Sequence, residues 1–215
     1  MTEQNQTVPR SLLLLSTFYG GMVTIAGVLG AKQVAMGPLA VEAGIFPFLL
    51  LISIASAVAE LHGKPTADRL ARFGFVPLVA AILLSFFVLQ LPTDPGMYEP
   101  AKAAFPIILG QSWRMMAAGI LAYGVSLTIN IWIFAKLRDA STRLAPLRGF
   151  VAAACSQVID TLIFISVSFY GVRPLWDLMA GQMFAKLALS AVMVPAVIWI
   201  AVRIGRRLDG DRSVT

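Results

Sequence analysis

Six stretches of this sequence are apolar over lengths that match the thickness of a lipid bilayer, and this limits its folds more than any other feature. A span needs about 20 apolar residues. The stretches lie near residues 11–34, 45–62, 75–92, 111–137, 149–171 and 179–203. Hydrophobic residues make up 58% of the chain and charged residues 13%, a composition unlike that of a soluble domain. The sequence therefore predicts an all-α polytopic membrane protein, a bundle of six transmembrane helices.

The ends of the chain and its longest connection are polar or rich in proline. We expect a polar tail over 1–10, the six-span transmembrane domain over 11–205 and a basic cytoplasmic tail over 206–215. The apolar stretch from Leu12 is longer than the core of an ordinary signal peptide, so it is predicted to stay as a span. The prolines of 92–106 predict an external loop there, with a dip into the membrane as the alternative.

The positive charges predict the orientation. With the N-terminus inside, the cytoplasmic segments hold most of the 17 Lys and Arg residues: Arg10, Lys64, Arg69, Arg72, Lys136, Arg138, Arg143, Arg148, Arg203, Arg206, Arg207 and Arg212. Cytoplasmic loops of membrane proteins carry this excess. We expect a multi-pass protein of the cell (inner) membrane with both termini cytoplasmic. The same bias explains the basic charge, so nucleic acid is not an expected partner.

A near-repeat places polar groups inside two of the spans. The segment Ser126–Phe134 and the segment Ser156–Phe164 both read S-x-x-I-[N/D]-x-x-I-F. Asn130 and Asp160 each follow their serine by four residues, so each pair shares a helix face. A carboxylate deep in a bilayer is costly unless it faces a partner or a cavity. The repeat predicts a site between the fourth and fifth spans.

Polar residues at helical spacing also occur in the second and sixth spans. Glu60 follows Ser53 and Ser56, and Lys186 lies between Gln182 and Ser190. These spans and the two with the repeat are expected to line a common interior, with the third span facing lipid. The glycines of the first span are expected to allow close helix approach.

Each polar residue also has a structural interpretation. The serines could bond carbonyls of their own helix, and Asn130 could join two helices. Glu60 could cap its helix or pair with Lys64. Asp160 and Lys186 could be a buried ion pair without another role. We favour a functional role for this last pair, because ionisable residues inside membranes usually mark binding sites.

Enzymatic chemistry is not expected. Cys155 is the single cysteine and His62 the single histidine, so an internal disulfide, a multi-cysteine metal site and a histidine-cluster metal site are excluded. The sequence has no plausible Ser-His or Cys-His pairing and no phosphate-binding G-x-x-x-x-G-K-[S/T] loop. No cofactor or metal is predicted.

Several segments resemble the queuosine precursor transporters, a family also named putative vitamin uptake transporters. Ala59–Lys64 is similar to the family's T-E-x-Y-G-K segment, and Ser156–Thr161 matches S-Q-x-x-D-T. Gly30-Ala31-Lys32, the stretch from Ser126 to Phe134, and Lys186 with Pro195 follow the family's order. The chain departs from the pattern at Ser56 and Asn130, where the family has Asp, and at His62, where it has Tyr.

The resemblance implies uptake of a queuosine precursor, 7-cyano- or 7-aminomethyl-7-deazaguanine, across the cytoplasmic membrane. The expected substrate-binding residues are Glu60, Asn130, Ser156, Gln157, Asp160 and Lys186. Carboxylates can accept the adjacent N–H and NH₂ groups of a guanine edge, and Gln157 and Asn130 can bond its carbonyl and ring N–H. Tyr123, Trp132 and Phe164 are candidates to stack on the base.

Other modes of action remain open in the sequence. The chain could be a facilitator or a carrier coupled to an ion. It could also be a substrate-capture subunit for a vitamin or another flat heterocycle, with separate energising partners. An intramembrane enzyme and a purely structural assembly factor fit the polar residues less well. The sequence makes no prediction of the oligomeric state.

Overall fold

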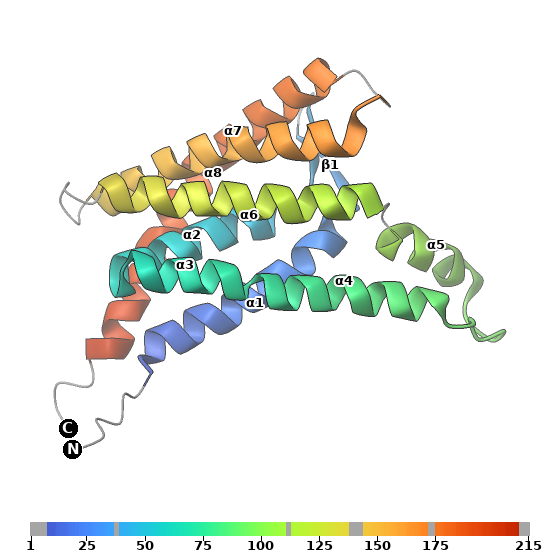
Figure 1. The fold of residues 1–215 in the computed structure, drawn as a ribbon, viewed down its shortest axis with the longest axis horizontal. Helices are drawn as coiled ribbons and strands as arrows, with labels where there is room; N and C mark the ends of the chain where they lie inside the picture. Colours follow the sequence, from blue (N-terminus) through green and yellow to red (C-terminus); the bar gives the residue numbers. More distant parts are fainter. Residues whose placement is uncertain (1–7, 37–38, 111–112, 138–143, 172–174, 211–215) are drawn as a thin grey trace.

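The computed structural model describes residues 8–36, 39–110, 113–137, 144–171 and 175–210, and most of them are helical (Figure 1). Its elements in chain order are α1 (Arg10–Gly30), β1 (Gln33–Met36), β2 (Leu39–Glu42), α2 (Ile45–His62), α3 (Lys64–Phe73), α4 (Phe75–Gln90), α5 (Glu99–Leu109), α6 (Trp113–Lys136), α7 (Ala145–Phe169) and α8 (Leu175–Gly210). Arg138, Arg143 and Arg212 of the predicted cytoplasmic segments lie outside the described residues.

The six predicted spans are confirmed. Among the described residues, six helical segments are long and apolar enough to cross a membrane: Arg10–Gly30, Ile45–His62, Lys64–Gln90, Met115–Lys136, Ala145–Ser168 and Met179–Gly210. Consecutive spans run in opposite directions (Figure 1). The chain is therefore a multi-pass membrane protein with an all-α bundle. The basic end is more helical than expected, because α8 continues to Gly210.

The helix α2 forms the centre of the bundle. Its middle, from Leu51 to Ala59, is entirely buried, and it packs against α1, α6 and α8. By contrast, α4 has no buried residue along its described length, as expected for a span that faces lipid. Its exposed leucine, valine and phenylalanine side chains would be unfavourable in water and suit a hydrocarbon environment.

An antiparallel β-hairpin follows α1, and the sequence did not predict it. The first span was expected to reach residue 34, but α1 ends at Gly30. Gln33 pairs with Glu42, and Val34 pairs with Val41. The amide of Ala43 then donates to the carbonyl of Lys32 at 2.8 Å. Each strand has only four residues, and neither QVAM nor LAVE alternates strictly between apolar and polar, so hydropathy gives no clear strand signal here. Its consequence is that Glu42 points back toward the bundle.

The role predicted for the glycines of α1 is wrong for Gly20, Gly21 and Gly27. A methyl group added at any of them, or at Gly30, would meet no atom within 4 Å. The close approach occurs instead at Gly44, just before α2. A methyl group there would lie 3.1 Å from the Cα atom of Gly30 and 3.0 Å from the carbonyl oxygen of Ala26. Gly44 thus sets the spacing between α1 and α2.

The proline-rich connection contains a short helix where we expected a loop. The helix α5 runs from Glu99 to Leu109, with Pro100 in its first turn. Proline is compatible with that position because the first amides of a helix have no helical acceptor. Pro106 lies inside the helix, near its end. The prolines shorten this helix but do not prevent it.

The first and last helices meet at one end of the bundle, here called the terminal end. The amide of Ser11 donates to Asp209 Oδ1 at 3.1 Å, and its hydroxyl donates to Asp209 Oδ2 at 2.5 Å. The same hydroxyl lies 2.7 Å from Nε2 of His62, at the end of α2. The hairpin lies at the opposite end, here called the hairpin end (Figure 1).

Candidate substrate-binding site

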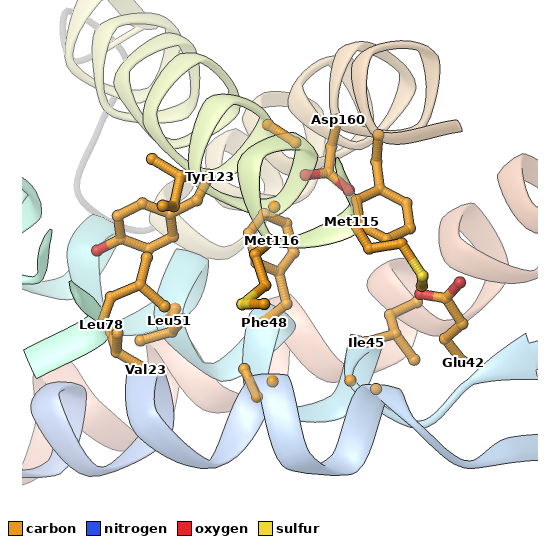
Figure 2. A pocket seen from close by; sticks show the side chains of 18 of the residues that line it. Val23, Glu42, Ile45, Phe48, Leu51, Leu78, Met115, Met116, Tyr123 and Asp160 are labelled. Atoms are coloured by element: carbon orange, nitrogen blue, oxygen red, sulfur yellow. The ribbon is translucent and has the colours of Figure 1, made fainter. Parts of the chain in front are cut away.

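A cavity of about 200 Å³ lies among the spans toward the hairpin end (Figure 2). Its walls come from α1, α2, α4 and α6, with single side chains from the hairpin and α8 and two from α7. Pockets for drug-sized ligands measure roughly 300–1,000 Å³, so this one suits a smaller molecule. Most of the lining is apolar, and the charged groups gather toward one end.

The charged end is built on Asp160 and Lys186. Lys186 Nζ donates to Asp160 Oδ2 at 2.9 Å, and the two side chains are only 9% and 11% exposed. Ser126 lies 3.4 Å from Asp160 Oδ1. A buried charge of this kind needs a partner with good geometry, since desolvation costs several kcal/mol per ion. The predicted ion pair is therefore present, and both of its members line the cavity.

Glu42 is a third charged group at the cavity, and we did not predict it. It comes from β2 and lies at the same end of the cavity as Asp160, away from Tyr123 and Leu78 (Figure 2). Burial raises the pKa of the Glu42 carboxyl; Lys186 acts to lower it and Asp160 to raise it. In sequence it is one acidic residue in a connection, so nothing there distinguishes it from a solvated loop residue.

The opposite end of the cavity is aromatic and apolar. Tyr123 lines it together with Leu78 and Val23 (Figure 2). The Tyr123 hydroxyl lies 2.6 Å from that of Tyr19, and Phe75 packs edge-on against its ring. These contacts hold the ring in one orientation. A mostly apolar and aromatic lining with a few polar groups at one end is typical of small-molecule binding sites.

Two of the three predicted stacking residues line the cavity. Tyr123 and Phe164 do, whereas Trp132 is 51% exposed on the outside of the bundle. The ammonium of Lys136 lies 4.7 Å from the centre of the Trp132 ring. The stacking role predicted for Trp132 is wrong, because the side chain points to the outer face of α6.

Three other predicted site residues are buried between helices and do not line this cavity. Asn130 accepts a hydrogen bond from Ser56 at 3.2 Å, which is the structural interpretation considered for it. Ser156 bonds the carbonyl of Ala153 in its own helix at 3.0 Å. Gln157 is 1% exposed, and neither amide atom has a hydrogen-bond partner among the described protein residues.

Glu60 lies in a different environment from the one predicted. It forms an ion pair with Arg148 of α7, in which both side chains are more than nine-tenths buried. The Arg148 guanidinium also lies 4.7 Å from the centre of the Phe134 ring. Lys64, the partner considered from the sequence, pairs with Asp68 at 2.5 Å instead. Glu60 lies near the C-terminus of α2, whereas the residues of α2 that line the cavity, such as Phe48 and Leu51, lie nearer its N-terminus.

The repeat does not enclose a pocket by itself. No residue from Ser126 to Phe134 lines the cavity, and the second copy contributes Asp160 and Phe164. The two copies instead meet through Ser126 and Asp160, the serine of one and the carboxylate of the other. The cavity therefore lies mainly between α1, α2 and α6, and not between the fourth and fifth spans as predicted.

Comparison with known proteins identifies the family. The family model described as "Putative vitamin uptake transporter" matches residues 42–200, more than half of the chain. The chain belongs to this family. It is also 26% identical over 188 residues to the "Probable queuosine precursor transporter" of Bacillus subtilis (strain 168), an alignment that covers 84% of this chain and 80% of that protein. No solved structure matches it.

The family assignment agrees with the resemblance found in the Ala59–Lys64 and Ser156–Thr161 segments. The matched region begins at Glu42 and includes Asp160 and Lys186, so all three charged groups of the cavity lie within it. The wall formed by α1 lies outside the matched region. The putative vitamin uptake transporter family thus shares with this chain the part of the sequence that supplies the charged end of the cavity.

Proposed function

We propose that this protein imports a deazaguanine-type base, a queuosine precursor, across the cytoplasmic membrane and binds it in the cavity. The observation that carries the proposal is a cavity among the apolar spans with Asp160 and Lys186 at one end and the ring of Tyr123 at the other. A guanine edge presents an N–H and an NH₂ side by side, and one carboxylate can accept both. The name of the Bacillus subtilis relative supports the same substrate class.

The charged and aromatic residues at the two ends of the cavity have separate roles in this proposal. Asp160 accepts the two N–H donors of the base, and Lys186 neutralises Asp160 before the base arrives. Tyr123 and Phe164 contact the faces of the ring system. Glu42 interacts with a substituent at the end of the cavity opposite Tyr123.

The remaining predicted site residues belong to a later stage of transport in this proposal. Asn130 lies seven residues beyond Tyr123 along α6, about 10 Å closer to the terminal end. Ser156 and Gln157 precede Asp160 on α7 and are displaced in the same direction. Glu60 lies at the terminal end itself. A base that moves from the cavity toward that end would pass these polar groups in turn.

We propose that the terminal end faces the cytoplasm. Arg69, Arg72, Lys136 and the arginines of the last turns of α8 all lie near that end. The cavity would then be in the outer half of the cell membrane, close to the side from which a substrate is imported. The energy source in this proposal is either a coupling ion or the substrate gradient.

Transport by the chain alone tests the proposal. Purified protein in proteoliposomes should take up radiolabelled 7-aminomethyl-7-deazaguanine, and unlabelled 7-cyano-7-deazaguanine should compete for uptake. Binding without uptake, followed by uptake when partner subunits are supplied, would favour a substrate-capture subunit. Absence of binding to either base, together with binding to a vitamin in a parallel screen, would contradict the deazaguanine assignment.

The charges at the cavity predict a preference between the two bases. When Glu42 is ionised, it and Asp160 supply two negative charges against the one positive charge of Lys186. The aminomethyl compound carries a cation, so it should bind more tightly than the neutral cyano compound. A hydrogen bond to a charged group is worth about 1.5–3 kcal/mol, which corresponds to roughly tenfold or more in Kd. Glu42→Gln should remove most of this difference, as measured by titration calorimetry.

The pH dependence of binding provides a second measurement on Glu42. Because burial raises the pKa of this carboxyl, its neutral form persists to higher pH than that of an exposed glutamate. Ionisation of Glu42 as the pH rises should strengthen binding of the aminomethyl compound. The Glu42→Gln variant should lack this increase. An unchanged preference and an unchanged pH profile in the variant would exclude Glu42 from substrate selection.

A further inference from the structure

A second concave region, which we call the arginine cleft, lies toward the terminal end between α7 and α8. It has a volume of about 580 Å³ and is lined by Arg203, Arg206 and Arg207 of α8, by Trp199, and by Ala145 and Pro146 at the start of α7, among others. None of the described residues that line it is acidic. The cleft therefore concentrates three positive charges in one concave surface.

The arrangement of the cleft suits a ligand with an anionic head and an apolar body. Residues 199, 203, 206 and 207 follow helical spacing, so they project from one side of α8. The Arg203 guanidinium lies 5.1 Å from the centre of the Trp199 ring, and this contact orients the arginine. Next to the cleft, Ile200 and Ile204 expose 47% and 43% of their surface on a membrane-spanning helix. A ligand held here would touch the guanidinium groups and the lipid-facing surface together.

We propose that the arginine cleft binds the headgroup of an anionic phospholipid. Guanidinium groups bind phosphate through two parallel hydrogen bonds, and tryptophan favours the boundary between headgroups and hydrocarbon. Basic clefts between spans on the cytoplasmic side are suited to acidic headgroups. The site is separate from the substrate cavity, with which it shares no lining residue.

Fluorescence quenching tests the site with minimal change to the protein. One variant retains Trp199 and carries Trp113→Phe, Trp132→Phe and Trp176→Phe. The matched control retains Trp132 in place of Trp199. Trp132 is 51% exposed and Trp199 is 55% exposed, and each contacts one basic side chain. The two variants therefore differ chiefly in the presence of the cleft.

The expected result is selective quenching at Trp199. Vesicles of phosphatidylcholine that contain a few per cent of brominated phosphatidylglycerol should quench Trp199 more strongly than vesicles with the same amount of brominated phosphatidylcholine. Trp132 should be quenched equally by both. Equal quenching of Trp199 by the two lipids would overturn the proposal, and so would the same preference at Trp132. Loss of the Trp199 preference in millimolar inorganic phosphate would assign the cleft to free phosphate and overturn the lipid assignment.

Charge removal gives an independent measurement of affinity. Each basic residue near an anionic surface strengthens binding by roughly fivefold, so Arg203→Gln, Arg206→Gln and Arg207→Gln together should weaken retention of phosphatidylglycerol about 100-fold. Native mass spectrometry of the purified protein measures this retention. The control removes Arg69, Arg72 and Lys136, the same number of charges near the same end, and should retain the lipid. Equal loss in both variants would mean that total charge, and not the cleft, holds the lipid.

Discussion

We expect the Asp160→Asn variant to lose uptake of a deazaguanine base almost completely while it remains in the membrane. The asparagine side chain would offer a donor where the base needs a second acceptor. It would also leave the Lys186 ammonium, which is 9% exposed, without its charged partner. Two hydrogen bonds to a charged group are worth about 1.5–3 kcal/mol each, so binding should weaken by at least about 100-fold.

The measurement is initial uptake of radiolabelled base, normalised to the amount of protein in the membrane. Asp68→Asn is the matched control, because it also removes a carboxylate paired with lysine, yet Asp68 lies outside the cavity. This control should transport at a near-normal rate. The double variant Asp160→Asn with Lys186→Met removes the unpaired charge and should also remain in the membrane without recovering uptake. Normal uptake by Asp160→Asn alone would exclude Asp160 from the substrate site.

The second large effect is expected at the ion pair of Glu60 and Arg148. Arg148→Met should lower the free energy of unfolding by about 3–5 kcal/mol, because it leaves the Glu60 carboxylate buried without this partner. It also removes the contact of the guanidinium with Phe134. Thermal unfolding of the protein in detergent, followed by circular dichroism, measures the change.

Two further variants separate charge burial from general damage to α7. Lys64→Met breaks the ion pair with Asp68. The side chains of Lys64 and Asp68 are 40% and 28% exposed, so this variant should lower the free energy of unfolding by no more than about 1 kcal/mol. Glu60→Met combined with Arg148→Met should regain much of the lost stability, since well-packed apolar pairs often replace buried ion pairs without loss. If Arg148→Met is as stable as Lys64→Met, the Glu60 pair contributes no more than a surface contact.

The spans and one ion pair could be predicted from sequence for physical reasons. Every backbone group inside a bilayer must be hydrogen-bonded within its own helix, so membrane-length apolar stretches have few alternatives. A carboxylate and an ammonium deep in such stretches must find partners, which made the pairing of Asp160 with Lys186 predictable. These constraints act on single residues or single helices and can be read without knowing how the helices pack.

The features that depend on packing could not be predicted. Glu42 reaches the cavity because a hairpin returns it to the bundle, and hydropathy does not detect this pairing. Lys64 was considered as the partner of Glu60 because it is close in sequence, but the partner is Arg148, which comes from a helix distant in sequence. Trp132 was a stacking candidate by residue type, and the rotation of α6 places it outside. Helix rotation and helix neighbours arise from contacts distant in sequence, so these assignments required coordinates.

The contacts at the terminal end bear on how easily that end could open. Ser11, His62 and Asp209 join the beginning of α1, the end of α2 and the end of α8, and the pair of Glu60 and Arg148 adds α7. All of these contacts are hydrogen bonds or ion pairs between polar side chains. If the helices part, water can hydrate each separated group, so hydration offsets much of the lost bonding. An apolar plug of the same size would have no such compensation. In the proposed transport cycle, in which the base leaves by this end, closure by polar contacts would therefore be reversed at lower cost than closure by an apolar plug.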